Sequence, residues 1–307
     1  MTALRILLLG KDGQVGTSLQ PRLAKLGDVS AHNRTTCDLG DAGQLRNVIR
    51  AIHPDLIVNA AAYTAVDKAE TDAALCHRIN AEAPAILAEE AKALGAWLIH
   101  YSTDYVFDGT KATAYAENDP PSPLSVYGRS KLAGDDAIAS TLPDHSILRV
   151  SWVYGAAGQN FARTILKLAS ERDELRIVAD QFGAPTSADL IADTTAEIIA
   201  RYLASPNRGD AALARGVFNL APSGRTSWHH YAVELVREAK RQGWPLKLSE
   251  DKIIPISTKD YPTPAARPRN SLLDTTKLRH LLGSDLPQWQ TPLRGFIAQL
   301  HDVNRQA

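Results

Sequence analysis

The chain has 307 residues, a length that predicts one large domain or two modest ones. Hydrophobic residues make up 44% and charged residues 22%, proportions that exclude a collagen-like or disordered chain. Lys and Arg number 34, and Asp and Glu also number 34, so no global basic field exists to bind nucleic acid or an anionic membrane surface. We therefore expect a globular protein whose partner is neither nucleic acid nor a membrane.

The cysteines and the first apolar segment both favour a cytoplasmic protein. Cys37 and Cys76 are the only cysteines in the chain; they fit no metal-ligand spacing, and such low usage is typical of a reducing compartment. The apolar stretch Ile6–Leu9 is too short for a signal peptide, and no run of about 18–20 apolar residues occurs that would span a membrane. Four apolar residues ended by Gly10 indicate a buried parallel strand instead.

Strand-like and helix-like segments alternate through the first half of the chain. Helices are expected over Leu45–Ile52 and over the alanine-rich stretch Thr71–Leu94. Pro21 falls inside a helical spacing that runs from Val15 to Leu26, so we expect a kink or a late start in that helix. The alternation predicts a parallel sheet covered by helices on both faces. Its strands are expected at Arg5–Leu9, Val29–His32, Leu56–Asn59, Trp97–Ser102 and Ile147–Ser151.

The second half is less regular and shows neither an internal repeat nor a clean linker. The sequence therefore predicts an α/β fold with a Rossmann-type doubly wound parallel sheet in residues 1–155, to which later segments can return. Residues 156–307 are expected to build mainly a smaller mixed lobe, packed tightly on the first. Helices in this half are expected at about Phe161–Glu171, Ala188–Ala204, Ser227–Arg241 and Trp289–Val303.

A glycine-rich turn directly follows the first strand, with Gly10, Gly13 and Gly16 at three-residue spacing. Glycines there allow a tight turn and let backbone N–H groups approach a pyrophosphate, and the next helix adds the positive end of its dipole. Any tight strand-to-helix turn uses glycine, so the triplet alone is weak. Its position after the first hydrophobic strand favours a dinucleotide. The small residues Ala60–Ala62 after the third strand would permit close contact with that cofactor.

The residues at the end of the second strand distinguish an NAD site from an NADP site. A carboxylate at that point holds the ribose 2′-hydroxyl of NAD, but the segment Ala31–Arg34 contains no acid. Arg34 could pair with a 2′-phosphate and Asn33 could donate a hydrogen bond to it, which favours NADPH. The alternative is that Arg34 is a solvated loop arginine. Asp38, just beyond, could accept a hydrogen bond from the adenine amino group.

Tyr127 and Lys131 form a pair four residues apart, which a helix places on one face. An ammonium near a phenol lowers the pKa of the phenol from about 10, so that the tyrosine can exchange a proton near neutral pH. Such a pair also occurs by chance on a helix surface. Thr103 strengthens the hypothesis, because it ends the fourth strand at the carboxyl edge of the sheet, where α/β sheets bind ligands. Its hydroxyl could hold a substrate carbonyl beside Tyr127.

These motifs together resemble the extended short-chain dehydrogenase/reductases, and among them the dTDP-4-dehydrorhamnose reductase family. The resemblance runs from residue 10 to residue 274, nearly the whole chain, and its motifs are specific jointly although each is modest alone. They are GKDGQVG, NAAAYTAVDKAE, HYSTDYVFDG, SPLSVYGRSKLAG, SWVYG, DQFGAPT and YPTPAARPRNSLLD.

The resemblance implies a reaction and roles for three residues. Hydride from NADPH, or from NADH, would pass to C4 of dTDP-4-dehydro-β-L-rhamnose, the last step of dTDP-L-rhamnose synthesis for O-antigen or other cell-surface polysaccharide. Carried over by position, Thr103 would hydrogen-bond the C4 oxygen and Tyr127 would protonate it. Lys131 would bind the nicotinamide ribose and hold down the pKa of the tyrosine.

The resemblance also implies which residues line the two ligands. Asp104 and Trp152 would contact the sugar, while Arg267, Arg269, Asn270 and Ser271 are candidates for the thymidine and diphosphate pocket. Taken locally, Trp152 is a core aromatic and the two arginines are solvated loop charges. Besides Tyr127 and Lys131, the expected cofactor residues are Gly10, Asp12, Gly13, Gln14, Val15, Asn33, Arg34, Asp38, Leu39, Ala60, Ala61, Ala62, Tyr63 and Thr64.

One departure concerns a metal. Some members of such a family are dimers bridged by Mg²⁺ through glutamates, and the positions matched by motif spacing are Ser18, Asp189 and Gln290. Only Asp189 keeps a carboxylate, and Mg²⁺ prefers carboxylate and water oxygens. The sequence therefore argues against a metal-bridged dimer and predicts no metal site, while a homodimer remains open.

Two alternatives stay open at this point. The first is a 4-keto-reductase or epimerase of another nucleotide sugar. Epimerases keep NAD bound, and the acid-free segment at Asn33 and Arg34 argues instead for an exchanging NADPH. The second is a non-catalytic NADPH-binding regulatory subunit, against which the presence of Thr103, Tyr127 and Lys131 counts.

Overall fold

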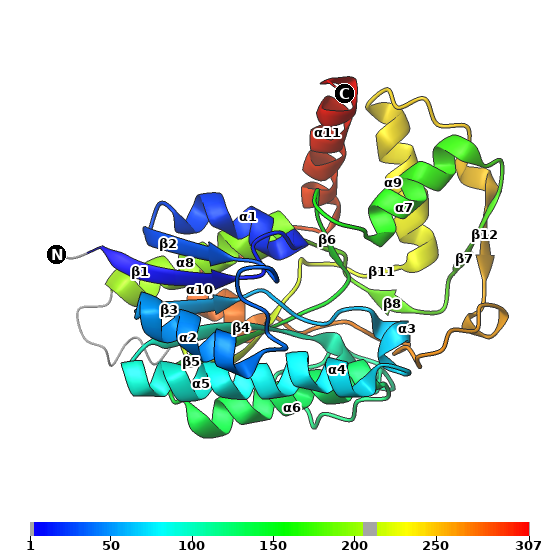
Figure 1. The fold of residues 1–307 in the computed structure, drawn as a ribbon. Coiled ribbons are helices and arrows are strands. Elements are labelled where there is room, and N and C mark those ends of the chain that lie inside the picture. The colour runs from blue at the N-terminus through cyan, green and yellow to red at the C-terminus, as the bar shows by residue number, and fades with distance from the viewer. Residues whose placement is uncertain (1–2, 205–213, 307) are drawn as a thin grey trace.

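A computed structural model describes residues 3–204 and 214–306. Its centre is a six-stranded sheet in the order β10-β5-β4-β3-β1-β2, in which every neighbouring pair is parallel (Figure 1). This confirms the predicted doubly wound α/β fold. The strands are β1 (Leu4–Leu9), β2 (Gly27–His32), β3 (Leu56–Asn59), β4 (Trp97–Thr103), β5 (His145–Val150) and β10 (Gly216–Leu220).

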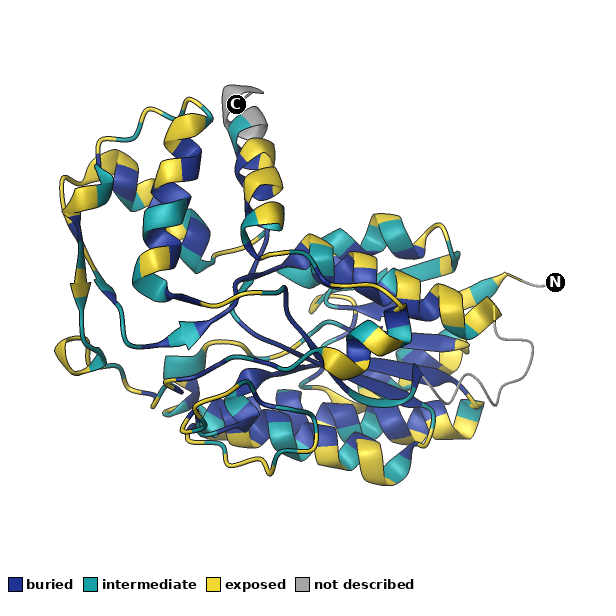
Figure 2. Ribbon diagram, turned by 180° about the vertical axis from the view of Figure 1, so that it is seen from behind, coloured by how far each residue is buried: buried dark blue, intermediate teal, exposed yellow. Residues whose placement is uncertain are grey.

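The central strands are apolar runs rather than alternating patterns because helices cover both faces of the sheet. Every residue of β3, β4 and β5 is buried, and Figure 2 shows the strands in dark blue between helices with yellow outer faces. On one face, α2 (Ala42–Ile52), α5 (Ala83–Leu94) and α6 (Val126–Thr141) pack against the sheet through side chains such as Leu45, Leu87 and Ile138. On the other face, α1 (Gln14–Leu23), α8 (Ala188–Ala204) and α10 (Thr276–Leu282) contribute Leu19, Ile191 and Leu278.

The sheet is therefore built from both halves of the chain. β10 pairs with β5 in parallel, with Phe218 opposite Leu148, and α8 packs beside α1. β10 was not expected from the sequence as a strand, because it is only five residues long and too short to show a period of its own. The five strands that were expected are all present, with ends that differ by at most two residues.

Two expected helices differ in detail. α1 begins directly at Gln14 and ends at Leu23, two residues after Pro21, so the predicted late start is wrong: the proline lies so near the end that the helix loses little by it. The stretch Thr71–Leu94 is not one helix but α4 (Ala73–His77), a π-helical turn (Arg78–Glu82) and α5. Pro84 has no N–H to donate to the carbonyl of Asn80, four residues earlier. The α-helical hydrogen-bond pattern is therefore interrupted, and the backbone forms a π-helical turn before α5.

The second lobe packs around its own apolar cluster. Helices α7 (Phe161–Glu171), α9 (Trp228–Arg241) and α11 (Gln290–Gln306) surround Tyr231, Trp289 and Leu235, which are almost fully buried. They stand to one side of the sheet in Figure 1. Short strand pairs join the lobe: β7 (Leu175–Val178) with β12 (Ile253–Ile256), β8 (Phe182–Gly183) with β11 (Thr226–Ser227), and β6 (Val153–Tyr154) with β9 (Thr186–Ser187).

The remaining regular pieces are short. They are α3 (Val66–Ala69) and the 3₁₀ turns Asp104–Val106, Glu250–Lys252 and Thr258–Asp260. Across the described ranges, no helix combines the length and the apolar character that a membrane crossing requires.

A substitution at Gly16 tests the close contact between the first turn of α1 and the backbone of the glycine turn. A Cβ on Gly16 would lie 2.0 Å from the carbonyl oxygen of Gly10, which is backbone and cannot move aside cheaply. We expect Gly16→Ala to destabilise the protein by about 1–3 kcal/mol in urea unfolding, as overpacking does. Gly43→Ala is the matched control, since its Cβ would approach only the Asp41 carboxylate at 3.4 Å within α2, and it should be neutral or slightly stabilising. Equal stability of the two variants would contradict the close contact.

Candidate active site

All six strands run in the same direction, so their carboxyl ends meet at one edge, and a cavity of about 910 Å³ lies there. Every residue expected to line the cofactor is in its wall, and so are Thr103, Asp104, Tyr127, Lys131, Trp152 and Arg267. The wall also contains residues that were not expected, among them Tyr105, Phe161 and Trp228. One continuous space therefore joins the glycine turn to the tyrosine–lysine pair.

The glycine turn presents backbone to this cavity. Gly10 has a φ of +81°, which favours glycine, and a Cβ there would lie 2.7 Å from the amide nitrogen of Ala61. α1 then begins at Gln14 with Gly13 as its N-cap, and no side chain caps it. The free N–H groups of its first turn, with the positive end of the helix dipole, form a site that suits a pyrophosphate.

The loop after β2 carries the groups that would face an adenosine ribose. Asn33 accepts hydrogen bonds from the N–H groups of Thr35 and Thr36, and its Nδ2 donates to Asp12 over 2.7 Å. The Arg34 side chain is 76% exposed, and its only ion pair with a described residue is a 3.5 Å contact from Nε to Asp38. The guanidinium is thus available for a phosphate, and this loop fits NADP, although the Asp12 carboxylate lies close by.

Thr103 and Asp104 share a hydrogen bond at the end of β4. The Thr103 hydroxyl donates to Asp104 Oδ1 over 3.1 Å and accepts from the N–H of Tyr105. Asp104 is 3% exposed, and its Oδ2 has no hydrogen-bond partner in the described part of the chain. Burial raises the pKa of Asp104 to about 6, against a smaller lowering by the hydroxyls of Ser271 and Thr103. An orphaned carboxyl oxygen in a cavity wall is a group ready to bind a polar ligand.

Tyr127 and Lys131 lie one turn apart on α6, whose N-cap Ser125 accepts from the N–H of Gly128. Lys131 is 1% exposed, and its Nζ donates to the carbonyl of Tyr101 over 2.7 Å and lies 2.9 Å from His100 Nε2. Burial lowers the pKa of Lys131 to about 8. His100 was not expected at the site, because a histidine inside a buried strand carries no local signal of its contacts.

The expected effect of Lys131 on Tyr127 is not found. Burial raises the pKa of Tyr127 well above its usual value, and the nearby Thr103 hydroxyl opposes this only in part. The physical reason is that desolvation disfavours a phenolate more strongly than any neighbour favours it. Tyr127 is therefore a protonated phenol at neutral pH, which suits a proton donor better than a base.

An aromatic wall faces the other side of the cavity. Trp152 and Trp228 stack with ring centroids 3.6 Å apart, and Trp152 has a φ of +48°, which is strained for a non-glycine residue. A Cβ on Gly183 would lie 2.6 Å from the Trp152 ring, so only glycine lets the ring lie there. Trp152 is thus in the cavity wall, as expected, but Trp228 was overlooked because a tryptophan at the start of a helix carries no local signal of a cavity.

Arg267 is in the cavity wall and is held by two residues from the first part of the chain. Its Nη2 donates to Asp67 in α3 over 2.7 Å, and its Nη1 lies 3.4 Å from the Tyr105 hydroxyl. The Asp67 carboxylate also accepts from the N–H of Ala265. A partly exposed guanidinium at the cavity rim is placed to meet an anionic ligand group.

Asn270 stays a predicted ligand residue, but most of its side chain is engaged within the protein. Its Nδ2 donates to the carbonyls of Lys111 and Thr113, and its Oδ1 accepts from the N–H of Leu272, so only one acceptor position of Oδ1 is left for a ligand. Asn270 is also absent from the cavity wall, as is the exposed Arg269. Local sequence could not reveal this, because those carbonyls lie more than 150 residues away in the chain.

The positions compared with magnesium ligands carry other contacts. Arg22 pairs with Asp189 over 3.0 Å and with Asp193 over 2.6 Å, and it donates to the carbonyl of Ser18. Within residues 3–204 and 214–306, no three His, Cys, Asp or Glu side chains gather as metal ligands would. The one carboxylate kept at these positions is thus neutralised by an arginine.

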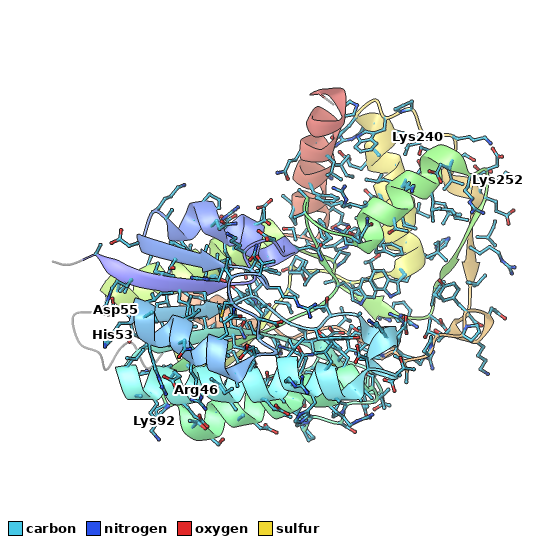
Figure 3. The ribbon with its side chains drawn as sticks, viewed as in Figure 1. Arg46, His53, Asp55, Lys92, Lys240 and Lys252 are labelled. Carbon is cyan, nitrogen blue, oxygen red and sulfur yellow. The ribbon has the colours of Figure 1, made fainter. Side chains whose placement is uncertain are left out.

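Charged side chains far from the cavity stay paired or solvated on the outer faces. Asp55, before β3, accepts from Arg5 at the opposite edge of the sheet, and Arg46 on α2 pairs with Glu90 of α5 (Figure 3). Lys240 projects from the second lobe in the same view. Positive potential at the cavity therefore comes from few groups: the α1 N-terminus, Arg34, Lys131 and Arg267.

This combination of a parallel sheet, a glycine turn and a buried Tyr–Lys pair defines a dinucleotide-binding reductase of the extended short-chain type. The model of the RmlD substrate binding domain matches residues 4–302. A dTDP-4-dehydrorhamnose reductase of Burkholderia thailandensis is 46% identical over 94% of this chain and 96% of that protein. One of Escherichia coli is 45% identical over 97% of this chain and 98% of that protein. The chain belongs to the dTDP-4-dehydrorhamnose reductase family.

Solved structures agree with this family. The crystal structure of a dTDP-4-dehydrorhamnose reductase from Bacillus anthracis in complex with NADP has a TM-score of 0.85 at 31% identity, covering 97% of this chain and all of that one. That of a Clostridium acetobutylicum ortholog has a TM-score of 0.84 at 32% identity, covering 96% and 99%. The resemblance noted in the sequence is thereby confirmed, as is the Rossmann-type fold.

Asp104 supplies a test of the buried carboxyl. Its folded pKa of about 6 is above that of an unfolded aspartate, so its contribution to stability is present at low pH and is lost as the pH rises through 6. Asp104→Asn removes that titration. We measure the free energy of unfolding in urea for both proteins. Between about pH 4 and pH 7, the value for the variant should rise relative to that of the wild type by about 3 kcal/mol.

Asp108→Asn is the matched control for this measurement. Hydrogen bonds from Thr110 and Tyr115 lower the pKa of Asp108, so its ionised form stabilises the fold and the variant should lose stability relative to the wild type as the pH rises. A difference of the same sign for both variants would argue against a raised pKa of the buried Asp104 carboxyl.

Proposed function

We propose that the protein reduces dTDP-4-dehydro-β-L-rhamnose to dTDP-β-L-rhamnose with NADPH as the hydride donor. The observation that carries the proposal is the shared cavity: the glycine turn at one end and Thr103, Tyr127 and Lys131 at the other line the same space. The names of relatives 45–46% identical along nearly the full chain support the substrate. NADP in the Bacillus anthracis structure supports the cofactor.

The proposed chemistry divides between the cofactor and the chain. NADPH, when bound, supplies the hydride that C4 of the sugar receives. The phenol of Tyr127 gives its proton to the C4 oxygen, and a high phenol pKa keeps that proton in place until the oxygen becomes basic. The Thr103 hydroxyl turns from Asp104 to the same oxygen and orients it. Lys131 holds the nicotinamide ribose and keeps positive charge near the phenolate that forms.

The sugar nucleotide occupies the side of the cavity that faces the second lobe. The stacked pair of Trp152 and Trp228 offers a flat apolar wall, and Asp104 offers a free carboxyl oxygen for a sugar hydroxyl. Arg267 exchanges part of its contact with Asp67 for the diphosphate. The low cysteine content further fits a cytoplasmic setting for this biosynthetic step.

A coupled assay tests the function directly. The protein is mixed with dTDP-4-dehydro-6-deoxyglucose, a 3,5-epimerase and NADPH, and the absorbance of the reduced nicotinamide is followed. We expect oxidation of NADPH that depends on both the sugar and the epimerase. No oxidation, or turnover of the sugar without net use of NADPH, would favour the alternative of a reductase or epimerase for another nucleotide sugar.

Tyr127→Phe tests the proton donor. We expect turnover to fall by at least about 100-fold, the usual contribution of a general acid, while NADPH binding measured by fluorescence titration is retained. Tyr202→Phe is the control and should keep near-normal turnover, because Tyr202 stacks on Trp97 and is not in the cavity wall. Near-normal turnover in Tyr127→Phe would end the assignment.

Arg34→Ala tests the choice of cofactor. Because Arg34 is the exposed cation beside the loop after β2, its loss should weaken NADPH at least about 10-fold more than NADH, as measured by KM for each. Arg237→Ala is the control. It removes an exposed arginine of α9 that pairs with Glu250, and it should leave the KM for both cofactors unchanged. An equal loss for both cofactors would show that Arg34 does not recognise the 2′-phosphate.

A further inference from the structure

A chain of buried polar side chains lies beneath the tyrosine–lysine pair. Asn59 ends β3 and is the direct register partner of His100 on β4, so the two side chains lie on the same face of the sheet. His100 in turn contacts Lys131 of α6 over 2.9 Å. All three residues are 1% exposed, so the hydrogen bonds among them cannot be replaced by water.

The hydrogen bond from the Ala61 N–H to Asn59 fixes the direction of the other hydrogen bonds in this row of side chains. The backbone N–H of Ala61 donates to Asn59 Oδ1 over 3.2 Å, which turns the Nδ2 of that amide toward His100 Nδ1, 3.0 Å away. An amide NH₂ only donates, so Nδ1 must accept. Burial is the larger cause that holds the pKa of His100 well below the usual range, so the ring is neutral and, with Nδ1 accepting, its single proton is on Nε2.

That proton points at Lys131. A neutral amine can accept from Nε2–H with its lone pair and still donate to the Tyr101 carbonyl, but an ammonium has no lone pair and would meet Nε2–H donor to donor. To receive an ammonium, the His100 proton has to move to Nδ1 and the Asn59 amide has to turn over. The Ala61 N–H then loses its acceptor.

We propose that Asn59 and His100 are positioning residues for Lys131, which couple the charge of the lysine to the tautomer of His100 and to the orientation of the Asn59 amide. Neither residue touches the reacting atoms. Their importance for catalysis rests on the proposed function, in which Lys131 holds the nicotinamide ribose and its charge favours the phenolate. The coupling itself is a property of the protein without cofactor.

The other groups around Lys131 set the pH at which this exchange occurs. Asp135, one turn further along α6, favours the ammonium, and the Cys76 thiol faces it from α4. Asp135 is itself held by the Ser102 hydroxyl at 2.6 Å and by Arg149 at 3.7 Å, and its Oδ1 lies 4.0 Å from His100 Nε2. Tyr127 is a neutral phenol and adds no charge. Burial outweighs Asp135 and leaves the pKa of Lys131 at about 8, near working pH.

Nitrogen NMR of the unloaded protein tests the coupling without reference to activity. With ¹⁵N-histidine incorporated and the His100 signals assigned by loss in His100→Gln, the shifts of Nδ1 and Nε2 report the tautomer. We expect Nε2–H at about pH 9.5 and Nδ1–H at about pH 6.5, with the ring neutral at both, since the lysine titrates between them. The same tautomer at both values, or a charged ring at the lower one, would overturn the proposal.

The pH dependence of kcat/KM gives a second, independent readout. Activity should fall as Lys131 loses its charge, and Asn59→Ala should move this alkaline limb up by about one pH unit, because protonation no longer leaves a buried amide N–H unpaired. An unchanged limb in a variant that retains activity would overturn the proposal. His145→Gln is the control. It changes a buried histidine at the first residue of β5, opposite Leu98, and it should leave the alkaline limb of kcat/KM unchanged.

The two experiments separate the proposals. A tautomer change in the NMR spectra together with no NADPH oxidation in the coupled assay would reject the proposed function and keep the coupling. Normal turnover with a single His100 tautomer would do the reverse. If Asn59→Ala does not fold, the wild-type spectra alone decide the matter.

Discussion

The direction shared by all six strands is the constraint on which the rest of this structure depends. In a parallel sheet the carboxyl ends lie at one edge, and the loops that leave them converge whatever their separation in the chain. That is how the glycine turn after β1, the Ala60–Ala62 segment after β3 and Thr103 at the end of β4 come to line one cavity. The helices on both faces bury β3, β4 and β5 completely, so this edge is where the sheet meets ligands.

Burial governs the chemistry of the site as strongly as contact does. Tyr127, Lys131 and Asp104 are each less than a tenth exposed, and desolvation is the largest influence on the pKa of all three. Desolvation raises the pKa of Tyr127, so that the phenol stays protonated. It lowers the pKa of Lys131 toward neutral pH and raises the pKa of Asp104. A protein with no net charge can therefore bind two diphosphates, because a few placed groups act where water is scarce.

Much of the fold and part of the site followed from the sequence, for identifiable reasons. Uninterrupted apolar runs such as Leu56–Asn59 marked buried strands, and the spacing of Tyr127 and Lys131 marked a helix face. β10 was missed because a five-residue strand has no period of its own, and the hydrogen bonds of Asn270 could not be foreseen because its partners are distant in the chain. The stack of Trp228 on Trp152 likewise joins elements from different parts of the chain.

The sequence by itself determined the family, the parallel α/β fold and the candidates Thr103, Tyr127 and Lys131, because these depend on local residue types at short, fixed spacings. Only the tertiary structure decided the state of those groups. The pKa of Tyr127 rises rather than falls, and His100 rather than the phenol is the side chain hydrogen-bonded to Lys131. Both depend on desolvation and on hydrogen-bond direction between β3, β4 and α6, and neither property exists until those elements pack together.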